Sequence, residues 1–359
     1  MVKSLQVGLG ARSYPIIIKN GILANIGADL KQRKFAKRFF VIADSTVADL
    51  YGRQLLASLK QAGYDTEILT FPAGEQSKVL STIGALASRL AQFGMDRGDG
   101  LLALGGGVTG DITGFLAASF MRGVPFVQVP TSLLAQVDSS VGGKTGVDIP
   151  EGKNLLGAFY QPKAVYIDSL VLQSLPAAEL LNGLAEVIKY GVIYDRDFFE
   201  FLEGNRQKIL NLDLPVIETV IESCCAIKAA VVEKDERESD LRRILNFGHT
   251  IGHAVEADSS YQLAHGMSVA IGMAAACRLA VDKGIFNQAS SARVVRLIAD
   301  FGLPVAIPEN AAAAKLKEYL QTDKKTVGGK VFFVLPTAIG RVEITDKIDD
   351  NILDRVLGG

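Results

Sequence analysis

The sequence predicts an α/β protein, in which a mostly parallel sheet forms an N-terminal domain and helices dominate a C-terminal domain. In the first half, short β-rich runs alternate with apolar residues at helical spacing, a pattern typical of βαβ units. After about Pro176 segments of helical periodicity follow one another, and extended character returns only near Val331–Leu335 and Arg341–Thr345. We therefore expect a Rossmann-like domain over 1–176, a mainly helical domain over 177–359, and a functional site in the cleft between them.

The individual elements follow from local patterns. Short apolar runs predict strands at Ser13–Lys19, Arg38–Ile42, Thr66–Phe71, Gly100–Leu104 and Pro125–Val129. A period near 3.6 residues predicts helices at Val47–Ala62, Val79–Phe93, Ala177–Ile193, Phe198–Ile209, Pro215–Lys234, His249–Ala257, His265–Lys283, Ser290–Phe301 and Ala311–Leu320. Ser290 is a residue type suited to a helix N-cap.

The composition indicates a folded, cytoplasmic protein. With 48% hydrophobic and 21% charged residues over 359 positions, the chain buries enough apolar surface to exclude disorder. Lys and Arg number 38 against 39 Asp and Glu, and this net charge of −1 does not favour a nucleic-acid partner. Met1–Gly10 lacks the apolar core of a signal peptide, and the apolar stretches end well short of the ~20 residues that span a bilayer, so we expect no membrane partner. Cys224, Cys225 and Cys277 fit neither a disulfide framework nor a paired zinc motif, which favours buried thiols in a reducing compartment.

Glycine-rich segments are the first candidates for ligand binding. Gly105–Asp111 (GGGVTGD) follows a predicted strand and opens a helical pattern, so it fits either a phosphate-binding loop or an ordinary tight turn. Gly8–Gly10 precedes a strand and is interpreted as a turn. Val141–Gly146 (VGGKTG) is expected to be a second glycine loop; with Lys144, Lys153 and Asn154 it suits a phosphate or carboxylate, although the P-loop spacing is absent. Asp138 is either a helix residue without a role or the partner of a substrate-binding lysine.

The chain has 3 histidines, and all lie within a short stretch. His249 and His253 are four residues apart, which places both on one helix face, and His265 follows. Thr250 stands where the zinc-protease motif HExxH carries its general base, so hydrolytic chemistry of that kind is disfavoured. A functional site is favoured over core packing. Spacing leaves open which two histidines bind a metal and which acid joins them; the candidates are Glu186, Glu222 and Glu256.

Several long motifs resemble the 3-dehydroquinate synthase family over essentially the whole chain. They are PAGEQSK (Pro72–Lys78), GGGVTGD (Gly105–Asp111), QVPTSLLAQVDSSVGGKTGVD (Gln128–Asp148), KNLLGAFYQP (Lys153–Pro162), GLAEVIKYG (Gly183–Gly191), RRILNFGHTIGHAVE (Arg242–Glu256) and LAHGMSVAIGM (Leu263–Met273). Their number and order argue against a chance match.

The resemblance implies an NAD-dependent metalloenzyme of the shikimate pathway. Such an enzyme is a phosphate-eliminating lyase that converts 3-deoxy-D-arabino-heptulosonate 7-phosphate to 3-dehydroquinate and phosphate, by transient oxidation, elimination, reduction, ring opening and intramolecular aldol closure. It implies Zn²⁺ or Co²⁺ held by Glu186, His249 and His265, with His253 as the active-site histidine near the substrate phosphate.

The resemblance also assigns residues to substrate and to NAD. Those on the substrate side are Lys144, Lys153, Asn154, Lys189, Lys228, Arg242, Asn246, Asp138 and Arg122, the last supplied across a homodimer interface. Those on the NAD side are Asp44, Glu75, Lys78, Gly107, Val108, Thr109, Gly110, Asp111, Thr131, Ser132, Lys144 and Lys153, with Ser132 where most relatives have threonine. One of Lys324 and Lys325 resembles a further phosphate contact.

Other activities are compatible with parts of this pattern. Another sugar-phosphate cyclase, such as 2-deoxy-scyllo-inosose synthase, would share the metal and NAD residues, but Arg242, Lys228, Asn154 and Asn246 favour a carboxylate-bearing substrate. A polyol dehydrogenase would accumulate NADH, whereas the cyclase has no net redox change. A catalytically inactive scaffold is disfavoured by the complete metal and lysine set.

Overall fold

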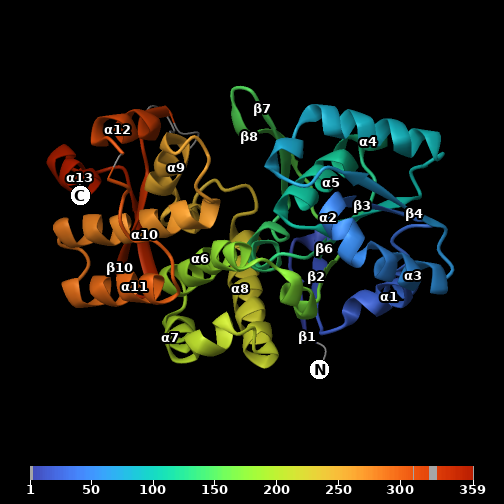
Figure 1. Cartoon of the computed structure of the whole chain (residues 1–359), viewed down its shortest axis with the longest axis horizontal. Helices are drawn as coiled ribbons and strands as arrows, with labels where there is room; N and C mark the ends of the chain where they lie inside the picture. The colour runs from blue at the N-terminus through green and yellow to red at the C-terminus, as the bar shows by residue number, and fades with distance from the viewer. Residues whose placement is uncertain (1–2, 310, 323–329, 359) are drawn as a thin grey trace. The chain divides into compact units, whose positions relative to one another are not determined.

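The computed structural model describes residues 3–309, 311–322 and 330–358. It contains two compact units, of which the first comprises Met1–Leu175 with Ile217–Glu233 and the second comprises Pro176–Val216 with Lys234–Gly359 (Figure 1). The predicted domains 1–176 and 177–359 differ from these units in one segment, because residues 217–233 associate with the first unit. The domain boundaries, and a functional site in a cleft between domains, stay predictions.

A seven-stranded sheet forms the centre of the first unit, with the strand order β1-β2-β9-β6-β5-β3-β4. Among the described residues of this sheet, β1 and β2 form the one antiparallel pair, so the predicted mostly parallel sheet is confirmed. Its strands are β1 (Lys3–Val7), β2 (Tyr14–Ile18), β3 (Phe39–Asp44), β4 (Thr66–Phe71), β5 (Gly100–Gly105), β6 (Phe126–Pro130) and β9 (Val165–Ile167). Sequence analysis missed β1 and β9, since segments this short show little periodicity.

Helices cover both faces of this sheet, and the sequence of β3 shows why. Its alternate residues Phe39 and Val41 join one apolar cluster, whereas Phe40 and Ile42 join the other. A strand that is buried on both faces is continuously apolar. The first cluster includes residues of α1 (Ile26–Arg33) and α3 (Arg53–Gln61), and the second includes residues of α4 (Leu80–Gln92) and α5 (Gly107–Ser119). The helix predicted over Val47–Ala62 is divided into α2 (Ser45–Val47), a π-helical turn (Ala48–Gly52) and α3.

The strand order reverses between β3 and β5. From β3 the chain passes to β4 on one side, and then crosses to β5 on the other side of β3. In open parallel sheets, the crevice at the carboxyl ends of strands flanking such a reversal is the usual ligand site. The residues at these two strand ends are Asp44 and Gly105.

A β-hairpin follows the sheet. Strand β7 (Lys144–Ile149) pairs antiparallel with β8 (Gly152–Phe159). The prediction of a glycine loop over Val141–Gly146 was therefore partly wrong, because its second half is strand. The glycines at 142 and 143 adopt φ values of 98° and 69°, which lead the chain into β7.

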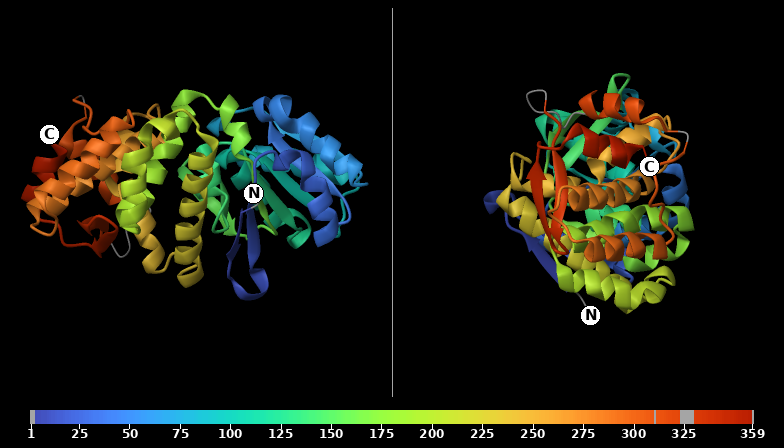
Figure 2. Two further views of the ribbon diagram at one scale, coloured as in Figure 1. Left: turned by 90° about the horizontal axis from the view of Figure 1, so that it is seen from below. Right: turned by 90° about the vertical axis from the view of Figure 1, so that its left-hand side faces the viewer.

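The second unit is mainly helical, as predicted. Its elements are α6 (Ala177–Ile193), α7 (Arg196–Leu210), α9 (His249–Asp258), α10 (His265–Asp282), α11 (Gln288–Asp300), α12 (Ala313–Thr322), β10 (Phe333–Ala338), β11 (Arg341–Thr345) and α13 (Asp350–Leu357); α8 (Leu214–Lys234) lies mostly in the first unit. Helix α10 packs against α6, α9 and α11 (Figure 2). The predicted N-cap Ser290 was wrong: Asn287 caps α11, and its side chain accepts a hydrogen bond from the Ser290 N–H at 2.7 Å.

Helices α9 and α10 approach each other backbone to backbone. A Cβ atom at position 272 of α10 would lie 1.8 Å from the carbonyl oxygen of Gly248, and one at position 252 of α9 would lie 2.7 Å from the carbonyl oxygen of Ser268. No side chain fits in these spaces. The close approach sets the distance between the histidines that the two helices carry.

The three cysteines are buried, and the described helices lack the length and apolarity that a bilayer requires. Cys224, Cys225 and Cys277 are free and buried. Burial raises the pKa of Cys225 and of Cys277 to about 12, so neither thiol is reactive near neutral pH. Across the described residues, every helix is too short or too polar to traverse a bilayer.

Replacement of Gly272 by alanine tests the close approach. Overpacking against a backbone oxygen costs about 1–3 kcal/mol or more, so we expect Gly272→Ala to lower the denaturation midpoint in urea. Gly204, inside α7, is the matched control, because a Cβ there meets nothing within 4 Å. Gly204→Ala should raise stability by about 0.5–1 kcal/mol through helix propensity. Equal midpoints for the two variants would contradict the packing argument.

Candidate active site

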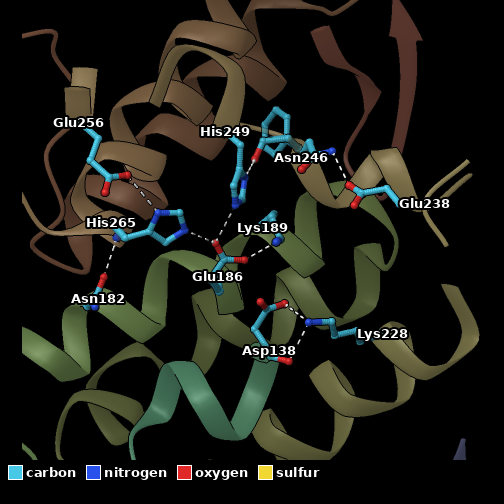
Figure 3. A network of polar contacts seen from close by, with 12 residues as sticks. Asp138, Asn182, Glu186, Lys189, Lys228, Glu238, Asn246, His249, Glu256 and His265 are labelled. Carbon is cyan, nitrogen blue, oxygen red and sulfur yellow. Dashed lines mark hydrogen bonds and ion pairs between the residues drawn. The ribbon is translucent and has the colours of Figure 1, made fainter. Parts of the chain in front are cut away.

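One buried carboxylate lies beside two imidazoles in the second unit. Glu186 points from α6, His249 is the first residue of α9, and His265 is the first residue of α10. The Nε2 atoms of His249 and His265 lie 3.4 and 3.7 Å from the same Oε1 atom of Glu186 (Figure 3). Glu186 is only 1% exposed, and Lys189 pairs with its other carboxylate oxygen. Three donor atoms of different helices are thus within 4.8 Å of one another.

Both imidazole rings are oriented through their other nitrogen. The Nδ1 atom of His249 lies 3.1 Å from the backbone oxygen of Phe247, and the Nδ1 atom of His265 lies 3.3 Å from Oε2 of Glu256. An acceptor at Nδ1 favours a proton on that nitrogen. Burial would lower the pKa of His265, but Glu186 and Glu256 outweigh it and raise the pKa to about 9.

These residues fit a divalent metal ion. Two imidazole nitrogens and one carboxylate oxygen form the donor set that catalytic zinc sites use, with further coordination positions left for substrate. Of the other acids that spacing had allowed, Glu222 belongs to the first unit and pairs with Lys3 at 2.6 Å. Glu256 contacts the other nitrogen of the His265 ring, on the side opposite Glu186.

His253 lies beside this group without joining it. Its ring centre is 5.4 Å from that of His249 and 5.8 Å from that of His265. Its nitrogen falls within 4.8 Å of donor atoms of Glu256 and His265, not in the set that contains Glu186. The structure therefore places His253 outside the donor set that contains Glu186, a distinction that sequence spacing could not make.

Arg242 and Asn246 are held by a short loop in the same unit. Both lie in the 3-10 segment Leu241–Asn246, and Arg242 is 1% exposed. Asp235 accepts backbone hydrogen bonds from Ser239, Asp240 and Arg242. Burial would raise the pKa of Asp235, but these N–H groups outweigh it and lower the pKa to about 2. The Asn246 amide donates to Glu238 at 2.8 Å.

The candidate nucleotide residues gather where the strand order reverses in the first unit. The Asp44 carboxylate caps α2 by accepting from the Val47 N–H at 3.0 Å, and it also accepts from the Thr109 hydroxyl at 3.4 Å. GGGVTGD forms a tight turn from β5 into α5, which begins at Gly107. Both interpretations of this motif thus stay compatible, since a tight turn and a helix N-terminus coincide there.

Residues following β6 and β4 complete this group. The Thr131 N–H donates to the backbone oxygen of Gly105 at 3.0 Å, and the Ser132 hydroxyl accepts from the Ala135 N–H at 3.3 Å. Glu75 is exposed in a 3-10 turn (Glu75–Ser77) after β4. Val108 and Gly110 lie in the first turns of α5.

Lys78 connects residues assigned to NAD with one assigned to substrate. Its Nζ atom lies 2.6 Å from Oδ2 of Asp111 and 2.6 Å from Oδ1 of Asn154. Burial would lower the pKa of Lys78, but Asp111 and Glu75 outweigh it and raise the pKa. The Asn154 N–H donates to Asp148 at 2.7 Å, and the Asp148 N–H donates to the Lys78 backbone oxygen at 2.7 Å. The hairpin is thereby tied to the segment that carries Lys78.

A second lysine pair involves Asp138, whose role in substrate binding stays a prediction. The Nζ atom of Lys228, on α8, lies 2.8 Å from Oδ1 of Asp138 and 2.7 Å from its backbone oxygen (Figure 3). Lys228 is buried, so its charge is held at one position by two acceptors.

Two of the other predicted residues lie on the hairpin. Lys144 is exposed at the start of β7, and Lys153 is half-buried on β8. Arg122 follows β5 and α5 in a left-handed backbone conformation, with φ of 68°. Lys324 and Lys325 lie outside the described residues.

Residues that hold other site residues in place through hydrogen bonds were not identified from the sequence. Asp148 and Glu238 hold Asn154 and Asn246, and Glu256 was considered only as a metal ligand. For Asp148 the available signal was its place at the end of VGGKTGVD, but its partner is a backbone N–H that no side-chain pattern reveals.

Comparison with known proteins identifies the family. Residues 68–182 match the family described as 3-dehydroquinate synthase N-terminal, and residues 183–326 match that described as 3-dehydroquinate synthase C-terminal. The chain belongs to the 3-dehydroquinate synthase family. A 3-dehydroquinate synthase of Desulforamulus reducens is 51% identical over 348 residues, covering 97% of this chain and 97% of that protein.

Solved structures of other sugar-phosphate cyclases resemble the chain. The 2-epi-5-epi-valiolone synthase of Streptomyces hygroscopicus subsp. jinggangensis, with NAD⁺ and Zn²⁺ bound, has a TM-score of 0.88 at 31% identity and covers 96% of this chain and 95% of its own. A 2-deoxy-scyllo-inosose synthase complexed with carbaglucose-6-phosphate, NAD⁺ and Co²⁺ has a TM-score of 0.90 at 26% identity, covering 99% of both chains. The curated relatives at 45–51% identity support the 3-dehydroquinate synthase function over the inosose synthase alternative.

Proposed function

We propose that the chain converts 3-deoxy-D-arabino-heptulosonate 7-phosphate to 3-dehydroquinate and phosphate as a phosphate-eliminating lyase of the shikimate pathway, using NAD and Zn²⁺ or Co²⁺. The observation that carries the cofactor assignment is the approach of two histidine Nε2 atoms to one Glu186 oxygen. Relatives of the family with NAD⁺ and Zn²⁺ or Co²⁺ support it.

Glu186, His249 and His265 would hold the metal ion, and the end of β3 with the start of α5 would hold NAD. When bound, the metal ion makes a substrate hydroxyl more acidic, and NAD⁺ takes up and later returns a hydride, so that there is no net redox change.

The buried cations would bind the anionic groups of the substrate. A phosphate and a carboxylate need positive charges and hydrogen-bond donors that are already oriented. Lys78, Lys189 and Lys228 are paired with Asp111, Glu186 and Asp138, which holds each ammonium group in position. The remaining members of the proposed substrate set are Lys144, Lys153, Asn154, Arg242, Asn246 and Arg122.

His253 would act at the substrate phosphate. Its nitrogen lies outside the donor set that contains Glu186, and an imidazole can hold a proton as the C–O bond to phosphate breaks. Asp138 would keep Lys228 in place during that step.

The first test is a coupled assay with the purified protein, heptulosonate 7-phosphate, NAD and Zn²⁺. We expect equal amounts of phosphate and 3-dehydroquinate, with no accumulation of NADH. Phosphate release without 3-dehydroquinate would contradict the assignment. Accumulation of NADH would identify a dehydrogenase instead, and absence of any product in the metal-loaded protein would indicate a binding protein.

The second test separates the histidines. We expect His265→Ala to lose both the bound metal and the activity, because it removes one of three ligands. His253→Ala should retain the metal and slow turnover by about 10²–10⁴-fold, the usual contribution of a proton-transfer group. Elemental analysis of each variant decides the assignment: metal retained in the first, or lost in the second, would reverse the two roles.

We further propose a homodimer in which Arg122 serves the neighbouring copy. Apolar side chains on the hairpin are exposed in the single chain, including Leu155 (46%), Leu156 (38%) and Phe159 (45%). Met121, next to Arg122, is 40% exposed. Both residues adopt a positive φ, and strained conformations of this kind are found at binding sites.

Charged substitutions on the hairpin test the dimer. Leu155→Asp combined with Phe159→Asp should convert a dimer to monomers in sedimentation velocity and abolish activity, since Arg122 would no longer reach its neighbour. Leu50→Asp is the control, because Leu50 is 54% exposed on a different element of the same unit. A monomeric parent protein with full activity would overturn this proposal.

The buried cysteines and the charge balance also bear on the compartment and the partners of the protein. We propose a cytoplasmic protein with no nucleic-acid or membrane partner. The three free, buried thiols support a reducing compartment, and the near-balance of 38 basic and 39 acidic residues supports a small-molecule partner.

A further inference from the structure

Glu256 is a buried carboxylate that the proposed chemistry does not use. Its side chain is 8% exposed, and Oε2 lies 3.3 Å from Nδ1 of His265, on the side of the ring opposite Glu186 (Figure 3). A buried carboxylate needs a partner that offsets its desolvation, and the imidazole N–H supplies one.

The two histidines beside Glu186 are oriented by different acceptors. His249 faces a neutral backbone oxygen at 3.1 Å, whereas His265 faces the carboxylate of Glu256. A carboxylate at Nδ1 holds the proton on that nitrogen, fixes the rotation of the ring and makes Nε2 a stronger electron donor. A backbone oxygen orients the ring but adds no charge.

The surroundings of Glu256 and His265 keep both groups in place. The backbone oxygen of Glu256 accepts hydrogen bonds from Tyr261 N at 2.9 Å and from the Ser259 hydroxyl at 2.7 Å. The Gly266 N–H, next to His265, donates to the Asn182 side chain at 2.6 Å, which ties the start of α10 to α6. The main chain therefore positions the His265 backbone, and Glu256 and Glu186 contact opposite sides of its ring.

We propose that Glu256 is a positioning residue that holds His265 in the tautomer and orientation required for metal binding, and that it raises the metal affinity of the site. The proposal rests on the metal centre in the proposed function. According to this proposal, a charged partner strengthens metal binding by His265, and not by His249.

Metal affinity measured by competition with a chromophoric chelator is the main test. Loss of an outer carboxylate of this kind weakens metal binding by about 10–100-fold. We expect a loss in this range for Glu256→Ala, and a smaller one for Glu256→Gln, whose amide oxygen still accepts a hydrogen bond. Glu200→Gln is the matched control, because Glu200 lies on α7 of the same unit in an exposed pair with Arg196 at 3.0 Å. It should bind Zn²⁺ as the parent protein does.

Two further measurements separate positioning from a general structural effect. The rise in melting temperature on adding Zn²⁺ compares each variant with its own metal-free form, so any loss of apo stability does not enter. That rise should be smaller in both Glu256 variants. The visible absorption of the Co²⁺-loaded protein should shift in Glu256→Gln and stay unchanged in Glu200→Gln, since only the former changes the hydrogen-bond partner of His265.

The outcomes distinguish this proposal from the proposed function. Parent-like Zn²⁺ affinity in both Glu256 variants, with an active and metal-bound parent, would overturn the positioning role alone. Two metal ions per parent chain, falling to one in Glu256→Ala with the tighter site unchanged, would also overturn it. In that case Glu256 would instead be a ligand with His253 and His265, whose donor atoms lie within 4.8 Å of its own. A parent protein that binds no metal would refute both proposals.

Discussion

The backbone contact between α9 and α10 is the constraint on which the candidate metal centre depends. Because positions 248 and 272 carry no side chain, the two helices approach within van der Waals contact of their main chains. His249 and His265 are the first residues of these helices, so both imidazoles lie close to Glu186 of α6. Wider spacing would separate the donors beyond the reach of one metal ion. The glycines in the histidine motif therefore set the ligand geometry.

Among the described residues, each buried lysine has a carboxylate partner. Lys78 pairs with Asp111, Lys189 with Glu186 and Lys228 with Asp138. Each pair offsets the desolvation of two charges and holds the lysine at one position. This arrangement explains how a chain of net charge −1 holds several buried cations. Whole-chain charge carries no information about such local pairs.

Much of the fold could be predicted from sequence, because strands and helices depend on neighbouring residues. Thr66–Phe71 and Ala177–Ile193 match β4 and α6 at both ends. The errors arose where a tertiary contact outweighs the local pattern. Lys144 and Lys153 sit on paired strands because each strand finds its partner across a turn, and α11 begins at an Asn287 cap instead of Ser290. For the site, spacing placed His249 and His253 on one helix face but could not rank them.

By itself, the sequence determined the α/β class, the helical second half and the set of chemistry-bearing residue types. The motif resemblance added a role for each, including Glu186 as the acid beside two histidines. Only the tertiary structure decided that Glu186 rather than Glu222 lies beside His249 and His265, that Lys78 joins Asp111 to Asn154, and that Glu256 faces the ring of His265. The physical reason is range: periodicity reports contacts within one element, whereas these contacts form between elements that the core brings together.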